Sequence, residues 1–141
     1  PLVSARMLHE EALDTLQQLH HRGLRMGVVS NTSVPGAMVR EMMERLQILP
    51  FFEFTFFSSE FIFRKPNAAM FEAALKRFEL KPSAVAHVGD QWDQDVAGAG
   101  ALGIRTVWLN RGQRQPKKGK IRPSGNIATL KILPDILKKL K

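Results

Sequence analysis

Apolar residues along this chain follow two spacings, one typical of amphipathic helices and one typical of short buried strands. Ala12, Leu16 and Leu19 recur at helical intervals before Gly23, so we expect a first helix over residues 5–22. Asn67 is a suitable N-cap for a later helix. Phe71, Leu75 and Phe78 form the buried stripe of that helix, and the remaining predicted helices cover residues 35–46, 96–102 and 134–140. The predicted strands cover residues 25–29, 54–57, 85–89, 104–109 and 127–129.

Strands and helices therefore alternate along most of the chain. Alternation of this kind is typical of a mainly parallel sheet with helices on both faces. We expect an α/β fold with three layers, α/β/α and Rossmann-like, formed by residues 1–141 as a single domain. Residues 111–125 are expected to form a basic polar loop within it.

Polar side chains follow three of the predicted apolar stretches. Ser30 and Asn31 follow the strand at 25–29, Lys65 follows a phenylalanine-rich run, and Asp90 ends the strand at 85–89 with Asp95 five residues later. Open α/β sheets bind ligands at the carboxyl ends of their strands. Two carboxylates at such an edge suit a hard divalent cation such as Mg²⁺. The alternative interpretations are a helix start for the two aspartates, an N-cap for Ser30 and a surface position for Lys65.

Charge is distributed unevenly. The net charge is +8, and residues 111–141 carry ten Lys and Arg but only one acid, Asp135. Residues 111–122 hold six cations, a pattern found in nucleic-acid-binding tails. No aromatic residue follows Trp108 to stack on a base, so we favour a solvated loop beside a phosphate-binding site and do not expect a nucleic-acid partner.

Composition excludes some classes of protein. The chain has no cysteine, which rules out disulfides and thiolate metal sites and is typical of a cytoplasmic protein. No apolar run reaches the ~20 residues that span a bilayer, so no membrane partner is expected. The sequence opens on Pro1, which suggests a processed or truncated chain.

The three polar motifs, in this order, closely resemble those of the haloacid dehalogenase-like hydrolase superfamily. They are Ser30-Asn31-Thr32, Arg64-Lys65-Pro66, and Gly89-Asp90 followed by Asp95. The resemblance covers about residues 5–110 and is closest to the branch of phosphoglycolate-phosphatase-like and 2-haloacid-dehalogenase-like members.

The resemblance implies a role for each motif residue. Ser30 and Asn31 would bind phosphoryl oxygens, and Lys65 would offset negative charge at the reacting group. Asp90 would bind Mg²⁺ with Asp95 as its partner, which gives Ser30, Lys65 and Asp95 as catalytic residues. In this family an aspartate attacks phosphorus and forms an aspartyl-phosphate that water hydrolyses.

The motif that supplies this nucleophile is absent. In the family it is Asp-x-Asp at the end of an N-terminal strand, ahead of a cap domain that selects the substrate. The five aspartates of this chain are Asp14, Asp90, Asp93, Asp95 and Asp135. None of them follows such a strand.

That strand lies at the centre of the family's sheet, between the strands that end at Ser30 and Asp90. Its absence would leave two apolar edges unpaired, which favours oligomer formation or pairing with an N-terminal segment. The chain is then either the C-terminal part of a longer hydrolase or a shortened, inactive relative. We favour the first, because Ser30, Lys65, Asp90 and Asp95 are all present.

Our main hypothesis is a Mg²⁺-dependent phosphatase acting on a small phosphorylated metabolite, with this chain inactive by itself. One alternative is a haloacid dehalogenase. Another is a catalytically inactive interaction module that uses the open sheet edge and the apolar residues 61–63, for which packing under their loop is the competing interpretation.

Two further features have simpler explanations than a ligand site. Residues 98–103 spell G-x-G-x-x-G, but a helix precedes them and a strand follows, the reverse of a dinucleotide site. We expect close packing there and no NAD. His87 lies inside an apolar strand and is interpreted as a core histidine.

Overall fold

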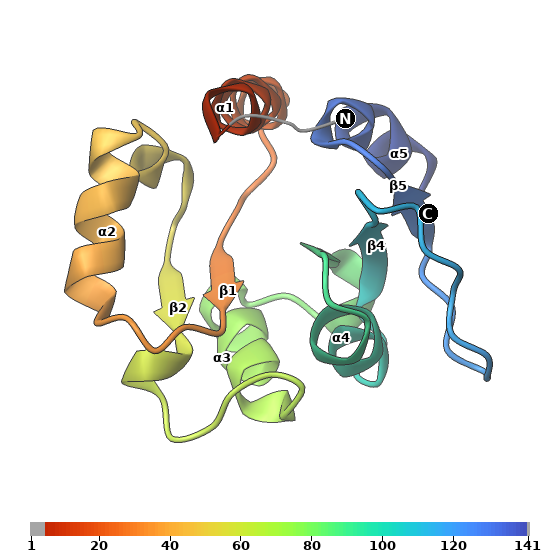
Figure 1. The fold of residues 1–141 in the computed structure, drawn as a ribbon. Helices are drawn as coiled ribbons and strands as arrows, with labels where there is room; N and C mark the ends of the chain where they lie inside the picture. Colours follow the sequence, from red (N-terminus) through yellow and green to blue (C-terminus); the bar gives the residue numbers. More distant parts are fainter. Residues whose placement is uncertain (1–4, 141) are drawn as a thin grey trace.

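The computed structural model describes residues 5–140, and its strands form two separate parallel sheets (Figure 1). The first sheet pairs β1 (Val28–Ser30) with β2 (Thr55–Phe57), and Val29 lies opposite Phe56. The second has the order β3 (Ala86–Gly89), β4 (Arg105–Leu109), β5 (Gly125–Ile127), and Val88 lies opposite Val107. The sequence prediction of an α/β fold with parallel strands is confirmed.

Helices cover both faces of the sheets. Figure 1 shows α1 (Ala5–His21) and α5 (Leu133–Lys139) above the strands, and α3 (Ala68–Phe78) and α4 (Gly98–Gly100) below them. The remaining helix, α2 (Gly36–Arg45), flanks β2 on the outside. The elements therefore form three layers, as the alternation of strands and helices predicts.

Buried apolar clusters tie each helical layer to both sheets. Below the strands, Phe71 of α3 packs with Ala99 and Ile104, and Val29 of β1 packs against the same cluster. Above them, Leu19, Val107, Ile127 and Leu133 form a second cluster, joined by Met26 and Val88. The two sheets are thus held in place by the helical layers, without strand pairing between β1 and β3.

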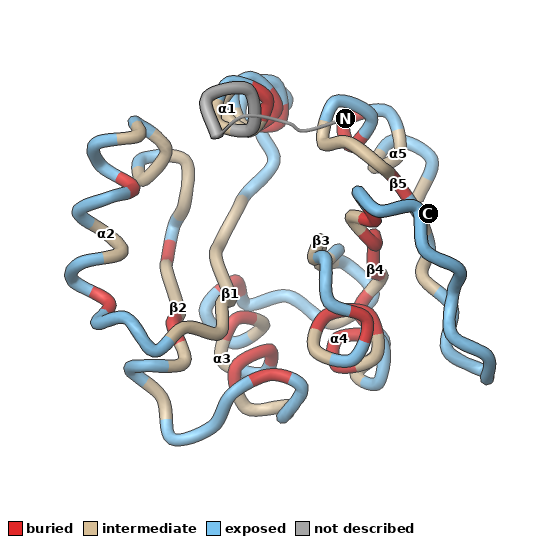
Figure 2. Tube along the Cα trace, viewed as in Figure 1, coloured by how far each residue is buried: buried red, intermediate tan, exposed pale blue. Residues whose placement is uncertain are grey.

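An apolar cavity of about 830 Å³ separates β1 from β3, and we call it the inter-sheet cavity. The edges of the two sheets line its sides, α3 lines its lower face, and α1 and α5 line its upper face. β4 is largely buried, whereas the residues of β1 are half-buried (Figure 2). This arrangement agrees with the expectation that the sheet lacks a central strand.

A buried carboxylate joins the two ends of the chain. Glu11 of α1 accepts hydrogen bonds from the Thr129 hydroxyl, the Leu130 amide and Arg111. Burial raises the pKa of Glu11, but these hydrogen bonds outweigh it and hold the pKa below its ordinary value. Glu11 therefore fastens α1 to the segment that precedes α5.

Most predicted elements are present, with shifted boundaries. The first strand begins at Val28 rather than residue 25, because its partner β2 begins at Thr55, opposite Val28. The helix predicted at 96–102 begins earlier, as a π-helical turn over Trp92–Ala97, because Trp92 and Val96 pack in a buried cluster with Trp108. Asn67 caps α3 as predicted, its side chain accepting from the Ala69 amide.

Ile62 and Phe63 do not pack under their loop. Ile62 is 95% exposed and Phe63 is 52% exposed, while Phe61 contacts the Phe56 ring. The packing interpretation is therefore wrong for Ile62 and Phe63.

No helix of residues 5–140 is long and apolar enough to span a bilayer.

Candidate active site

A polar pocket of about 420 Å³ lies where β1 and β3 end. It is lined by Ser30, Asn31, Arg64, Lys65, Asp90, Gln91, Gln94 and Asp95. All five residues predicted to form a site are among them. The pocket combines cations, carboxylates and neutral donors, so it can hold a small anion together with a cation.

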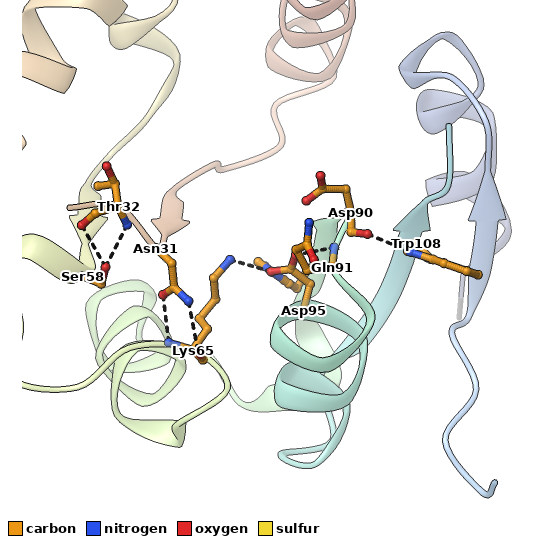
Figure 3. A network of polar contacts seen from close by, with 9 residues as sticks. Asn31, Thr32, Ser58, Lys65, Asp90, Gln91, Asp95 and Trp108 are labelled. Atoms are coloured by element: carbon orange, nitrogen blue, oxygen red, sulfur yellow. Dashed lines mark hydrogen bonds and ion pairs between the residues drawn. The ribbon is translucent and has the colours of Figure 1, made fainter. Parts of the chain in front are cut away.

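The floor of this pocket is a buried ion pair (Figure 3). Lys65 Nζ lies 2.5 Å from Asp95 Oδ1, and the two side chains are 8% and 5% exposed. His87 Nε2 lies 2.9 Å from the same oxygen, and the Gln91 amide donates to Asp95 Oδ2 at 3.0 Å. Both carboxylate oxygens of Asp95 are thus engaged by the protein, and Lys65 is held in one position.

The pKa of Asp95 reflects this environment. Burial raises it, but the hydrogen bonds from His87 and Lys65 and the Lys65 charge outweigh burial and lower the pKa from 3.8 to about 2. Asp95 is therefore ionised at neutral pH, as a partner for the Lys65 ammonium must be.

Glycine at position 89 makes room for this carboxylate. A Cβ built on Gly89 would lie 2.2 Å from Asp95 Cγ, well inside van der Waals contact. Any side chain at the end of β3 would displace Asp95 and with it the ion pair.

Asn31 links the end of β1 to Lys65. Its Nδ2 donates to the Lys65 carbonyl and its Oδ1 accepts from the Lys65 amide, both at 2.9 Å. The side-chain amide is therefore engaged in holding the Lys65 backbone. The phosphate-binding role predicted for Asn31 stays a prediction.

The rim of the pocket differs from the floor in exposure and in the partners of its side chains. Asp90 is exposed and Ser30 is half-buried. Within residues 5–140, the Asp90 carboxylate and the Ser30 hydroxyl form no hydrogen bond or ion pair with the protein. The Asp90 carbonyl accepts from Trp108 Nε1 at 3.0 Å, which anchors the turn after β3 to β4. The backbone at the rim is fixed, and the Asp90 carboxylate and the Ser30 hydroxyl are available to a ligand.

The carboxylates of this pocket fit Mg²⁺ only in part. No cluster of three or more His, Cys, Asp or Glu side chains among residues 5–140 could hold a metal ion alone. Mg²⁺ is commonly held by one or two carboxylates together with waters and substrate phosphate. Asp90 fits that mode because its carboxylate is available, whereas both Asp95 oxygens already accept from protein donors.

The basic loop reaches the neighbourhood of the site. Lys117 contacts the exposed Asp93 carboxylate at 3.0 Å, three residues beyond Asp90. Asp93 is thus solvated at the start of a helix, as predicted, and it draws the loop toward the pocket. The cations of this loop are exposed and add positive potential there.

Sequence reasoning missed two contributions to the floor. His87 was interpreted as a core histidine, yet it is half-buried, bonds to Asp95 and packs edge-on against Phe71. The anchoring of Lys65 by Asn31 was also missed. A polar residue within an apolar strand, three positions before Asp90, was the available signal for His87.

The rejection of a dinucleotide site at residues 98–103 agrees with the geometry. A helical turn precedes this stretch and β4 follows it. Gly98 lies against α3, where a Cβ would come within 3.1 Å of the Phe71 ring and 3.2 Å of Pro66. The small residues serve helix packing.

Comparison with known proteins gives one consistent family. Residues 2–103 match the model of the haloacid dehalogenase-like hydrolases. The chain is 33% identical over 135 residues to a glyceraldehyde 3-phosphate phosphatase of Methanocaldococcus jannaschii, covering 94% of this chain and 58% of that protein. It is 32% identical over 124 residues to a phosphoserine phosphatase of Thermus thermophilus, covering 88% of this chain and 49% of that protein.

Solved structures lead to the same family as the sequence comparisons. A 2-haloacid dehalogenase from Pseudomonas syringae superposes with a TM-score of 0.81 at 29% identity, covering 93% of this chain and 53% of that one. The chain spans about half the length of the curated relatives it matches.

Proposed function

Because this chain belongs to the haloacid dehalogenase-like hydrolase family, we propose that it contributes the phosphate- and metal-binding part of a Mg²⁺-dependent phosphatase for small phosphorylated metabolites. The observation that carries the proposal is the buried Lys65–Asp95 pair, set beside the available Ser30 hydroxyl and Asp90 carboxylate in one pocket. The names of its relatives support phosphate esters as the substrate class.

Each residue has a defined task in this proposal. The Ser30 hydroxyl donates to a phosphoryl oxygen, and the fixed Lys65 ammonium offsets the charge on the transferring group. Asp95 holds the Lys65 side chain in place through the buried ion pair. Bound Mg²⁺, held by Asp90, supplies further charge stabilisation. The metal role predicted for Asp95 stays a prediction.

In this proposal the carboxylate nucleophile comes from outside residues 1–141. Asp14 lies on α1 and bonds to Gln18, and Asp135 lies in α5. Neither lines the polar pocket. We therefore expect residues 1–141 alone to bind phosphate and Mg²⁺ without turning over a substrate.

Binding by the isolated chain tests the proposal. Inorganic phosphate with MgCl₂ should shift the NMR signals of the Ser30 and Asp90 amides. Asp90→Asn should abolish the Mg²⁺ response, whereas Asp93→Asn, which alters another exposed carboxylate three residues away, should retain it. Equal responses from the two variants, or no response of the unmodified chain, would overturn the proposal.

Turnover gives a second check. The chain should leave p-nitrophenyl phosphate uncleaved. Activity that survives Asp90→Ala would refute the site assignment. Release of halide from a 2-haloacid, without any response to phosphate, would favour the dehalogenase alternative.

An interaction module remains a second candidate because of one observation. Ile62 and Phe63 are exposed, and so are Met38 and Met42 on α2, at 60% and 54%. Exposed apolar groups of this size are typical of contact surfaces. A folded chain that binds neither phosphate nor Mg²⁺, and forms a stable oligomer that Ile62→Lys disrupts, would favour this function. Homo-oligomer formation and a cytoplasmic location stay predictions.

A further inference from the structure

Arg64 brings a second cation to the polar pocket. It lines the pocket and is exposed, and its guanidinium forms no hydrogen bond or ion pair within the part of the chain that the structure describes. The neighbouring Lys65 ammonium is in the opposite situation, because it is buried and paired with Asp95. The pocket therefore contains one cation that is paired with a protein carboxylate and one that is available to a ligand.

Other arginines on the surface do have acidic partners. Arg25, Arg40 and Arg45 each form an ion pair with a glutamate, at 2.7, 2.5 and 2.7 Å. The exposed Asp90 carboxylate lines the same pocket as Arg64, yet no ion pair joins the two side chains among residues 5–140. Two opposite charges thus stay separate in one pocket, so that Asp90 is available to a cation and Arg64 to an anion.

The backbone at Arg64 is fixed, although its side chain is free. The Arg64 carbonyl accepts a hydrogen bond from the Asn67 amide at 2.9 Å. The amide of the next residue, Lys65, donates to Asn31 Oδ1 at 2.9 Å. The peptide group between Arg64 and Lys65 is therefore held at both its oxygen and its nitrogen, and the Arg64 side chain starts from a fixed point at the edge of the pocket.

The pocket has room for more than a phosphate group. Its volume of about 420 Å³ falls within the range of about 300–1,000 Å³ that is typical of sites for whole small molecules. In the proposed function a phosphate group is held by Ser30, Lys65 and bound Mg²⁺. Among the pocket residues left to contact the rest of the substrate, Arg64 is the cation, and Gln91 and Gln94 are neutral.

The chemistry of a guanidinium limits what Arg64 can bind. It is planar and always charged, and it donates two parallel hydrogen bonds to the paired oxygens of a carboxylate or a phosphate. We infer that Arg64 is a specificity-determining residue, which binds a second anionic group, a carboxylate or a second phosphate, on the phosphorylated substrate. The inference rests on the proposed function and narrows its substrate class to phosphate esters that carry two anionic groups.

Titration calorimetry of residues 1–141 with matched probes tests this inference. The probes are ω-phosphorylated carboxylates and α,ω-bisphosphates with two to four carbons between the two groups, each compared with the simple alkyl phosphate of the same length. All titrations contain MgCl₂ and low salt, because salt screens exposed charges. The measured quantity is the preference, defined as the dissociation constant of the alkyl phosphate divided by that of the two-anion probe. For the best probe it should be at least about fivefold, as expected for one charge-assisted contact at an exposed site.

Two variants separate Arg64 from the general positive charge of the chain. Arg64→Gln removes the guanidinium and should reduce the preference to about one. Arg114→Gln removes the same charge from another exposed arginine, whose side chain has no partner among the described residues and which does not line the pocket, so it should retain the preference. Amide NMR spectra of both variants check that the fold is unchanged. A preference for the carboxylate probes alone would assign Arg64 to a carboxylate, and one for the bisphosphates alone would assign it to a second phosphate.

Three results would overturn the inference. They are no preference of the unmodified chain at any probe length, a preference that survives Arg64→Gln, and an equal loss of preference in Arg64→Gln and Arg114→Gln. The last would show that two-anion probes respond only to the overall charge. The alkyl phosphates distinguish this failure from failure of the proposed function. If they bind without any preference for a second anion, the role of Arg64 is wrong and the phosphate site stands, whereas if they do not bind, the proposed function itself fails.

Discussion

The floor and the rim of the polar pocket are built on different principles. On the floor, Lys65 and Asp95 are buried and paired with each other, and Asn31 holds the Lys65 backbone. On the rim, Asp90 is exposed and its carboxylate is not engaged by residues 5–140. Changes on the floor should therefore alter stability, and changes on the rim should alter ligand binding alone. Asp95 and Asp90 are both carboxylates of one pocket, yet they should affect stability differently. The reason is that the Asp95 carboxylate is desolvated and the Asp90 carboxylate is not.

Removal of the floor carboxylate should have the largest effect. Asp95→Ala leaves the Lys65 ammonium buried without its partner, and breaking a buried pair typically costs about 3–5 kcal/mol. The free energy of unfolding from urea denaturation measures this loss. Asp90→Ala is the matched control on the rim. Equal stability of the two variants would contradict the distinction between floor and rim.

A side chain at Gly89 should disturb the floor without removing any charge. In Gly89→Ala the new methyl would overlap the Asp95 carboxylate, and overpacking of this kind typically costs about 1–3 kcal/mol. Gly100→Ala is the control, because nothing lies within 4 Å of its Cβ position and alanine favours a helix. The expectation fails if both variants unfold at the same urea concentration.

Low pH should weaken the Lys65–Asp95 ion pair on the floor of the pocket, within a defined pH interval. The pKa of Asp95 is about 2 in the folded chain against 3.8 as its ordinary value, so its contribution is present above about pH 4 and is lost as the pH falls toward 2. A shift of this size corresponds to roughly 2 kcal/mol. The difference in unfolding free energy between the unmodified chain and Asp95→Asn should shrink over this interval. A constant difference would show that Asp95 keeps its ordinary pKa.

The rim should contribute least to stability. Asp90→Asn and Ser30→Ala should each change the free energy of unfolding by no more than about 0.5 kcal/mol, since surface substitutions without protein partners seldom do more. A loss of more than 1.5 kcal/mol in either variant, in the range typical of buried hydrogen-bonded groups, would place that residue with the floor.

Features set by residues close together in the sequence were predictable, whereas features set by contacts between distant residues were not. The helix at 68–78 and its Asn67 cap follow from local spacing, and the strands ending at Ser30 and Gly89 follow from short apolar runs. The five residues predicted for the site do line one pocket, because the carboxyl ends of parallel strands converge.

Interactions between distant residues were not predictable from local patterns. The bond from His87 to Asp95 depends on the direction in which the β3 side chain points, and the pairing of Asn31 with Lys65 depends on the course of the loop after β2. The exposure of Ile62 and Phe63 depends on how that loop lies against β2. Each is set by tertiary geometry, which composition and periodicity do not contain.

The Glu11 contacts have a consequence for the order in which the molecule assembles. Glu11 bonds to groups 100, 118 and 119 positions further along the chain, so α1 cannot take up these contacts until synthesis has passed residue 130. Contacts this distant in sequence slow folding, because a long loop must close before they form. A nascent chain therefore lacks the Glu11 contacts that fasten α1 until residue 130 has been made.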